Sequence, residues 1–231
     1  MSTLIKQFFL TDTPEDEGDE VELETNTPTP EPSQTLTLTA SPTVIVETDP
    51  IWEDDFSNHT RWYLADGDDF GFRYQDDGYK IYNNLLNASI WSLGYIGLND
   101  IRIEIDAARV EGPDDGYFGV FCRHSDDGQN YYGLVIGDNG FYGIFKMAEG
   151  ELDFIESGYD EDERIKLGEG ETNHIEGACF GNKLSLFVND QFLLEVTDDI
   201  HIAGGAGILA ANKVSGTGIE VLFDNFAVYK E

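Results

Sequence analysis

Basic residues are scarce in this sequence, and long apolar runs are missing. Its 231 residues include 13 lysines and arginines against 46 aspartates and glutamates, a formal net charge of -33. A field of that sign repels phosphate backbones and anionic lipid, so we expect no nucleic-acid partner. Because no run of 18 apolar residues occurs, we expect no membrane insertion. The charge favours solubility and leaves cations or neutral molecules such as glycans as partners.

Cysteine is almost absent as well. The two cysteines, Cys122 and Cys179, lie in segments that we expect to be strands. One disulfide between them is geometrically allowed, and two separate buried thiols are the alternative.

The first fifty residues lack the composition of a folded domain. They carry eleven acidic residues and one lysine, and then run into "TNTPTPEPSQTLTLTASPTV". Such a segment buries too little surface to offset chain entropy, so we predict a disordered, acidic, Thr/Pro-rich spacer over residues 1–50. The start, "MSTLIKQFFLTDTPEDEGDE", does not fit a secretory signal peptide. The protein is then either cytoplasmic, exported by an unusual route, or made with a leader that this sequence omits.

From residue 51 to residue 231 the sequence shows no sustained helical period. Short segments rich in β-branched and aromatic residues recur instead, separated by Asp-Gly, Asn-Gly and Gly-Asn turns. In "KLSLFV", Leu184, Leu186 and Val188 alternate with Ser185 and Phe187, as in a strand with one buried face. We therefore predict a second domain over residues 51–231, an all-β sandwich of two antiparallel sheets.

Several segments resemble concanavalin A-like, laminin-G-like jelly-roll domains. They are "WEDDFSNHTRWYLADGD", "IRIEIDAARVEGPDDGYFGVFCRHSDDGQNYYGLVIG" and the pair "NKLSLFVNDQFLLEVTD" and "GIEVLFDNFAVYK", which together span residues 52–229. The chain resembles bacterial surface-protein versions and, at "GYFGVFCR", 3-keto-disaccharide hydrolase-like relatives. This resemblance implies a jelly roll, a fold that serves lectins, glycanases, adhesion modules and spacers alike.

Aspartates gather in several turns, which raises the question of calcium. The candidate ligands are Asp66, Asp68, Asp77, Asp114 and Asp115. The spacing fails for an EF-hand, because Phe70 stands where an oxygen ligand is needed and no glutamate closes the loop. Asp-Gly is also the ordinary solution for a hairpin turn. We therefore expect turns and no cofactor, with calcium as the alternative.

Glu104 and Asp106 are the candidate catalytic residues. They match the first two places of the Glu-x-Asp-x-Glu pattern of laminarinase-like glucanases. The third place holds Ala108 or Arg109, so the acid/base of a retaining mechanism is missing. We expect no catalysis from this strand.

Aromatic residues give the best indication of a binding site. Sugars bind to the flat faces of aromatic rings, while polar side chains hold their hydroxyl groups. Arg123 either projects from the concave sheet toward a ligand or pairs with a nearby acidic residue. Trp52 and Trp91 are expected to fill the sandwich core. The predicted ligand-binding residues are Trp62, Tyr117, Arg123, Tyr131, Tyr132 and Tyr142.

We therefore predict a non-catalytic carbohydrate-binding module, extracellular or on a cell surface, that can belong to a larger surface assembly. Two alternatives remain open. One is a glycoside-processing hydrolase of the 3-keto-disaccharide type, and the other is a structural or sensory ectodomain that binds a protein.

Overall fold

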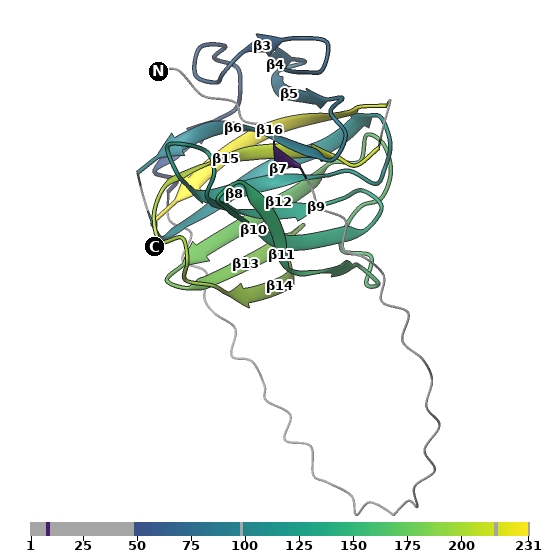
Figure 1. The fold of residues 1–231 in the computed structure, drawn as a ribbon. Coiled ribbons are helices and arrows are strands. Elements are labelled where there is room, and N and C mark those ends of the chain that lie inside the picture. The colour runs from purple at the N-terminus through teal and green to yellow at the C-terminus, as the bar shows by residue number, and fades with distance from the viewer. Residues whose placement is uncertain (1–7, 10–48, 98, 215–216, 231) are drawn as a thin grey trace, which may run out of the picture. The chain divides into compact units, whose positions relative to one another are not determined.

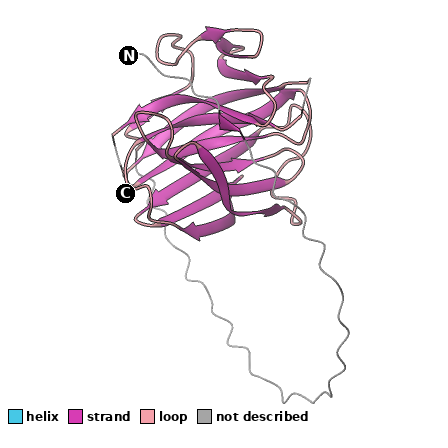
Figure 2. Ribbon diagram, viewed as in Figure 1, coloured by secondary structure: helices cyan, strands magenta, loops and turns pink. Residues whose placement is uncertain are grey.

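The computed structural model describes residues 8–9, 49–97, 99–214 and 217–230 (Figure 1). In these residues all regular structure is strand, as Figure 2 shows. The described part of the chain accordingly offers no helix long and apolar enough to cross a membrane. Apart from Phe8–Phe9 and residues 49–50, the predicted spacer lies outside the described residues.

The described residues form sixteen strands. They are β1 (Phe8–Phe9), β2 (Trp52–Asp54), β3 (Ala65–Asp66), β4 (Phe70–Gln75), β5 (Gly78–Asn83), β6 (Ala88–Ile96), β7 (Ile101–Glu111), β8 (Tyr117–His124), β9 (Tyr131–Ile136), β10 (Phe141–Ala148), β11 (Glu151–Tyr159), β12 (Asn173–Phe180), β13 (Lys183–Val188), β14 (Gln191–Thr197), β15 (Gly205–Asn212) and β16 (Ile219–Tyr229).

The strands form two antiparallel sheets. The seven-stranded sheet has the order β1-β6-β15-β8-β9-β10-β11. The nine-stranded sheet has the order β14-β13-β12-β7-β16-β5-β4-β3, and β2 pairs with β16. The predicted two-sheet sandwich is therefore confirmed. The short strand β1 is not among the strands that the sequence pattern predicts.

The main core lies between the two sheets, and strand alternation decides which residues enter it. In β9, Tyr132, Leu134 and Ile136 face this core from the seven-stranded sheet. From the nine-stranded sheet, Leu184 and Leu186 of β13 do the same. The alternation predicted for β13 is thus confirmed.

A disulfide joins the two sheets. Cys122 of β8 is bonded to Cys179 of β12, 57 positions further along the chain. Of the two alternatives for the cysteines, the structure contains the disulfide and not the separate thiols.

The turn between β4 and β5 shows why the acidic triplets recur. Asp76 and Asp77 have φ angles of 53° and 60°, and Gln75 pairs with Gly78 across the turn. This is a two-residue hairpin whose central residues both need positive φ, which aspartate tolerates better than most residues. The turn interpretation is confirmed for this triplet.

Candidate functional site

The seven-stranded sheet carries a second apolar cluster on the side facing away from the core. In β9, Tyr131 and Val135 point to this outer side, because they alternate with the core residues Tyr132 and Leu134. We call this set the outer aromatic cluster. Its buried members are Trp91, Tyr117, Phe121, Tyr131, Val135, Phe145, Met147, Leu209 and Ala211.

The seven-stranded sheet curves so that its outer side is concave, and we call this concave side the hollow. From β6 to β11 there are five strand spacings, about 24 Å if the sheet were flat. Yet β1, which pairs directly with β6, also lies within 8 Å of β11, Cα to Cα. The two edges therefore curl toward each other. Phe154 of β11 accordingly reaches Tyr117 of β8, three strands away in the sheet, with ring centroids 5.7 Å apart.

Buried polar atoms in this hollow have no protein partner. Trp91 Nε1, Tyr117 Oη and His124 Nε2 are fully buried and make no hydrogen bond. The hydroxyl groups of Ser89 and Tyr131 neighbour each other, but neither makes a hydrogen bond of normal geometry. Burying a polar group without a partner costs free energy, so the three atoms on Trp91, Tyr117 and His124 require an explanation. A bound ligand that forms hydrogen bonds to these atoms would explain why they lack protein partners.

His124 is neutral in this environment. Its ring lies 4.1 Å from that of Trp91 and 5.4 Å from that of Tyr131, centroid to centroid. Burial lowers the pKa of His124 to about 4, although nearby Asp126 and Asp127 act in the opposite direction. At neutral pH the imidazole therefore offers uncharged nitrogen atoms to the hollow.

This burial predicts a loss of stability in weak acid. The unfolded chain takes up a proton on His124 near pH 6.5, whereas the folded chain does so only near pH 4. Stability is therefore lost as the pH falls between these values, by about 3 kcal/mol at pH 4. Urea unfolding of the wild type and His124→Gln at several pH values measures this difference, with His59→Gln on an exposed loop as control. Equal pH slopes for all three proteins would contradict the prediction.

The chemistry of the hollow suits an uncharged, hydroxylated ligand. Aromatic faces stack on the apolar faces of sugar rings, and neutral nitrogen and hydroxyl groups bond to sugar hydroxyls. Lys213 Nζ lies 5.9 Å from the ring centroid of Tyr117 and 5.6 Å from that of Phe141, so one cation lies next to these two rings.

Of the predicted ligand-binding residues, the structure brings Tyr117 and Tyr131 together. Both belong to the outer aromatic cluster, and burial raises the pKa of both hydroxyl groups. Tyr132 faces the main core and donates a hydrogen bond to Asp198. Tyr142 packs against the same core.

Trp62 also lies in the main core, away from the hollow. Its ring packs against Phe56 and Phe226 at 5.1 Å, and its Nε1 donates to Asp54 Oδ2 at 3.2 Å. The sandwich core therefore accounts for its burial.

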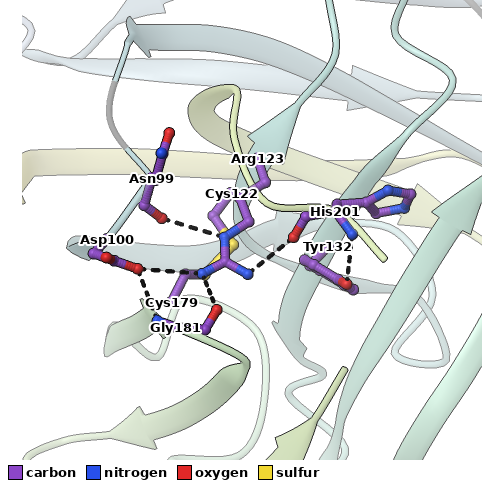
Figure 3. The surroundings of a disulfide bond; sticks show 8 residues. All are labelled: Asn99, Asp100, Cys122, Arg123, Tyr132, Cys179, Gly181 and His201. Atoms are coloured by element: carbon purple, nitrogen blue, oxygen red, sulfur yellow. Dashed lines mark hydrogen bonds and ion pairs between the residues drawn. A yellow bond between two sulfur atoms is a disulfide. The ribbon is translucent and has the colours of Figure 1, made fainter. Parts of the chain in front are cut away.

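Arg123 lies in a structural network beside the disulfide (Figure 3). Its guanidinium donates to the backbone oxygens of Asn99, Gly181 and His201 at 3.2, 2.7 and 2.9 Å. It also pairs with Asp100 at 3.5 Å. Of the two alternatives for Arg123, the structure shows the ion pair. Only 1% of the residue is exposed, so no free guanidinium projects into the hollow.

Glu104 and Asp106 lie on the other sheet. In β7 they are paired with Glu176 and His174 of β12. Asp106 Oδ1 lies 2.7 Å from His174 Nδ1, and this contact lowers the pKa of Asp106 and raises that of His174. Glu104 is paired with Arg102. Glu104 and His174 border a cleft of about 630 Å³, well separated in the fold from the outer aromatic cluster.

The candidate calcium ligands are dispersed over exposed turns and strand ends. The described residues contain no group of three or more His, Cys, Asp or Glu side chains that could hold a metal ion. Asp66 Oδ1 instead lies 3.0 Å from Tyr82 Oη. All five candidates, Asp66, Asp68, Asp77, Asp114 and Asp115, are exposed.

Sequence reasoning missed three residues of the hollow, Ser89, Trp91 and His124. The prediction that Trp91 fills the sandwich core is wrong, since Trp91 belongs to the outer aromatic cluster. The signal was present in "ASIWSL", where Ser89 and Trp91 alternate with Ile90, a core residue. Both faces are buried here, so apolar character alone did not distinguish them.

Comparisons with known proteins show the fold. No protein-family model and no curated protein matches the chain. Among solved structures, the carbohydrate-binding module CBM66 from Bacillus subtilis is similar with a TM-score of 0.61 and 16% identity, over 75% of this chain and 98% of that one. A β-glucanase from Bacillus licheniformis has a TM-score of 0.52 and 13% identity, over 80% of this chain and all of that one. A Bacillus subtilis protein of unknown function with a galectin-like fold has a TM-score of 0.54 and 12% identity, over 79% of this chain and 96% of that one. The chain therefore has the jelly-roll sandwich fold of concanavalin A-like proteins.

Proposed function

We propose that the chain is a non-catalytic carbohydrate-binding module whose ligand occupies the hollow of the seven-stranded sheet. The observation that carries this proposal is the set of buried, unpartnered polar atoms on Trp91, Tyr117 and His124 among aromatic rings. A neutral oligosaccharide supplies both the hydroxyl partners and the apolar ring faces. The similarity to a carbohydrate-binding module and to a β-glucanase supports a carbohydrate-related role at the level of the fold.

We place this role outside the cell or on its surface. The disulfide between Cys122 and Cys179 supports this location, since structural disulfides persist in oxidising compartments. The alternative as a glycoside-processing hydrolase would need carboxyl groups next to the bound sugar. Glu104 and Asp106 lie on the other sheet, so binding without bond cleavage is the function that the geometry supports best.

Tyr117→Phe tests the site with two readouts of opposite sign. The change removes only the buried hydroxyl, which has no partner in the ligand-free protein. We expect the free energy of unfolding to rise by about 1 kcal/mol, because a buried unsatisfied group is lost. Affinity for the sugar is expected to fall about fivefold to tenfold, because a hydrogen bond to the ligand is lost.

The matched control is Tyr82→Phe in the nine-stranded sheet. Tyr82 Oη donates to the backbone oxygen of Gly67 at 2.6 Å, so this change should lower stability and leave sugar affinity unchanged. An array of neutral oligosaccharides identifies the ligand, and titration calorimetry measures the affinity of each protein, with calcium and with chelator. We expect no calcium dependence and no released product. If no glycan binds and a protein partner is recovered instead, the ectodomain alternative replaces this proposal.

A further inference from the structure

Lys213 differs from most cations of this chain because no carboxylate pairs with it. The 13 lysines and arginines are outnumbered by 46 acidic residues, so a cation on this surface readily finds a carboxylate. Lys6 lies outside the described residues, and nine of the other twelve cations have a carboxylate oxygen within 4.0 Å. Lys166 donates instead to the backbone oxygen of Thr172 at 3.0 Å. In the described part of the chain, Lys213 and Lys230 have neither kind of partner.

Lys213 lies beside the hollow. It directly follows Asn212, the last residue of β15, and its side chain is exposed. Its Nζ is 5.9 Å from the ring centroid of Tyr117 and 5.6 Å from that of Phe141. Tyr117 is a buried member of the outer aromatic cluster, and Phe141 packs against that cluster. An exposed ammonium group therefore stands next to the rings to which we assign the sugar.

The two rings leave the N–H groups of Lys213 without an oxygen acceptor. An ammonium group has three donors, and a cation over an exposed ring gains only about 0.5–1 kcal/mol. Asp114 and Asp115 are exposed and precede Tyr117 closely in the chain, but neither lies within 4.0 Å of Lys213 Nζ. A carboxylate or sulfate group on a ligand would accept charge-assisted hydrogen bonds from this ammonium group.

We propose that Lys213 selects oligosaccharides that carry an anionic group, a carboxylate or a sulfate, beside the neutral sugar unit bound in the hollow. This inference rests on the proposed function, because the hollow must first bind sugar. The outer aromatic cluster contacts the neutral unit, and Lys213 Nζ pairs with the anionic group of the adjoining unit. The net charge of -33 repels anions, but at 0.15 M salt this repulsion is screened beyond about 8 Å. An exposed ion pair of this kind strengthens binding about threefold to fivefold.

Pairs of oligosaccharides that differ in one anionic group test this selection. One set of pairs compares uronic acid units with their methyl esters, and a second compares sulfated with unsulfated units. These pairs are added to the glycan array, and titration calorimetry at neutral pH and 0.15 M salt measures each pair that binds. In at least one set we expect the anionic member to bind about threefold to fivefold more tightly, and 0.5 M salt to remove most of the difference. Equal affinities within every pair, or tighter binding of the neutral members, would overturn the selection.

Lys213→Gln then tests whether this lysine is responsible. We expect the anionic member to bind about as weakly as the neutral one, while affinity for the neutral member stays unchanged and shows that the hollow is intact. Lys213→Arg should keep the preference because it keeps the charge. Lys230→Gln is the matched control, since it removes the same charge from an exposed lysine that follows β16 in the other sheet.

Each remaining outcome contradicts one specific claim. A preference that persists in Lys213→Gln overturns the role of this lysine. A preference lost equally in Lys230→Gln overturns it as well, because net charge would then be the cause. If neutral members bind without any preference, the proposed function stands and the selection fails. If no glycan of either kind binds, the proposed function fails, and the selection fails with it.

Discussion

Replacing both cysteines, Cys122→Ala/Cys179→Ala, is expected to lower the free energy of unfolding by about 4 kcal/mol. The disulfide closes a loop across 57 positions of sequence and connects β8 in one sheet to β12 in the other. Without it the unfolded chain gains the entropy of an open loop, which grows with loop length. Urea unfolding at neutral pH measures the difference between oxidised wild type and variant.

The control for this prediction is the reduced wild type. It should lose about as much stability as the double variant, whereas the double variant should not respond to reductant. A loss below about 1 kcal/mol would contradict the assigned stabilising role. Sugar binding to the folded variant should persist, since both cysteines belong to the core between the sheets and not to the outer aromatic cluster.

Most of the fold prediction rests on strand periodicity and on the residues found in turns. The alternation of Leu184, Leu186 and Val188 with Ser185 and Phe187 is reproduced in β13, where the first three side chains are buried. Asp76 and Asp77 adopt the positive φ angles that a tight hairpin demands. Such local rules act over a few residues, so one sequence is enough to apply them.

The site was harder to predict because both faces of the seven-stranded sheet are buried. Every residue of β8, β9 and β15 is buried, so these strands show no polar side that would mark an outer face. "YYGLVI" therefore does not reveal that Tyr131 lines the hollow while Tyr132 enters the core. The second sheet packs on one face only, and this long-range packing decides which of the two tyrosines enters the core.

The role of the charged residue Arg123 could not be decided from the sequence either. Its position at the end of β8 favoured two interpretations, a ligand contact or an ion pair. Its φ angle of 56° and its acceptors on three separate segments, at Asn99, Gly181 and His201, result from tertiary structure. No local pattern around "FCRH" encodes those carbonyl groups.

Arg123→Met is expected to cost about 3 kcal/mol of folding free energy, because buried carbonyl oxygens lose their donors. The hydrogen bond to the backbone oxygen of His201 is buried, and its removal contributes most of the lost folding free energy. Arg123→Lys keeps the charge but not the planar fork, so it should recover only part of the stability. Chemical unfolding of the two variants measures both losses.

The same variants separate the two roles considered for Arg123. A ligand-binding arginine would lose sugar affinity in Arg123→Lys with little change in stability. The network in Figure 3 predicts the reverse, lower stability with unchanged affinity of the folded protein. Arg123 follows Cys122 directly, and Gly181 lies two positions after Cys179, so the arginine and the disulfide hold the same two segments together. Combining Arg123→Met with loss of the disulfide should therefore cost measurably more or less than the sum of the separate losses, because the two contacts share their backbone.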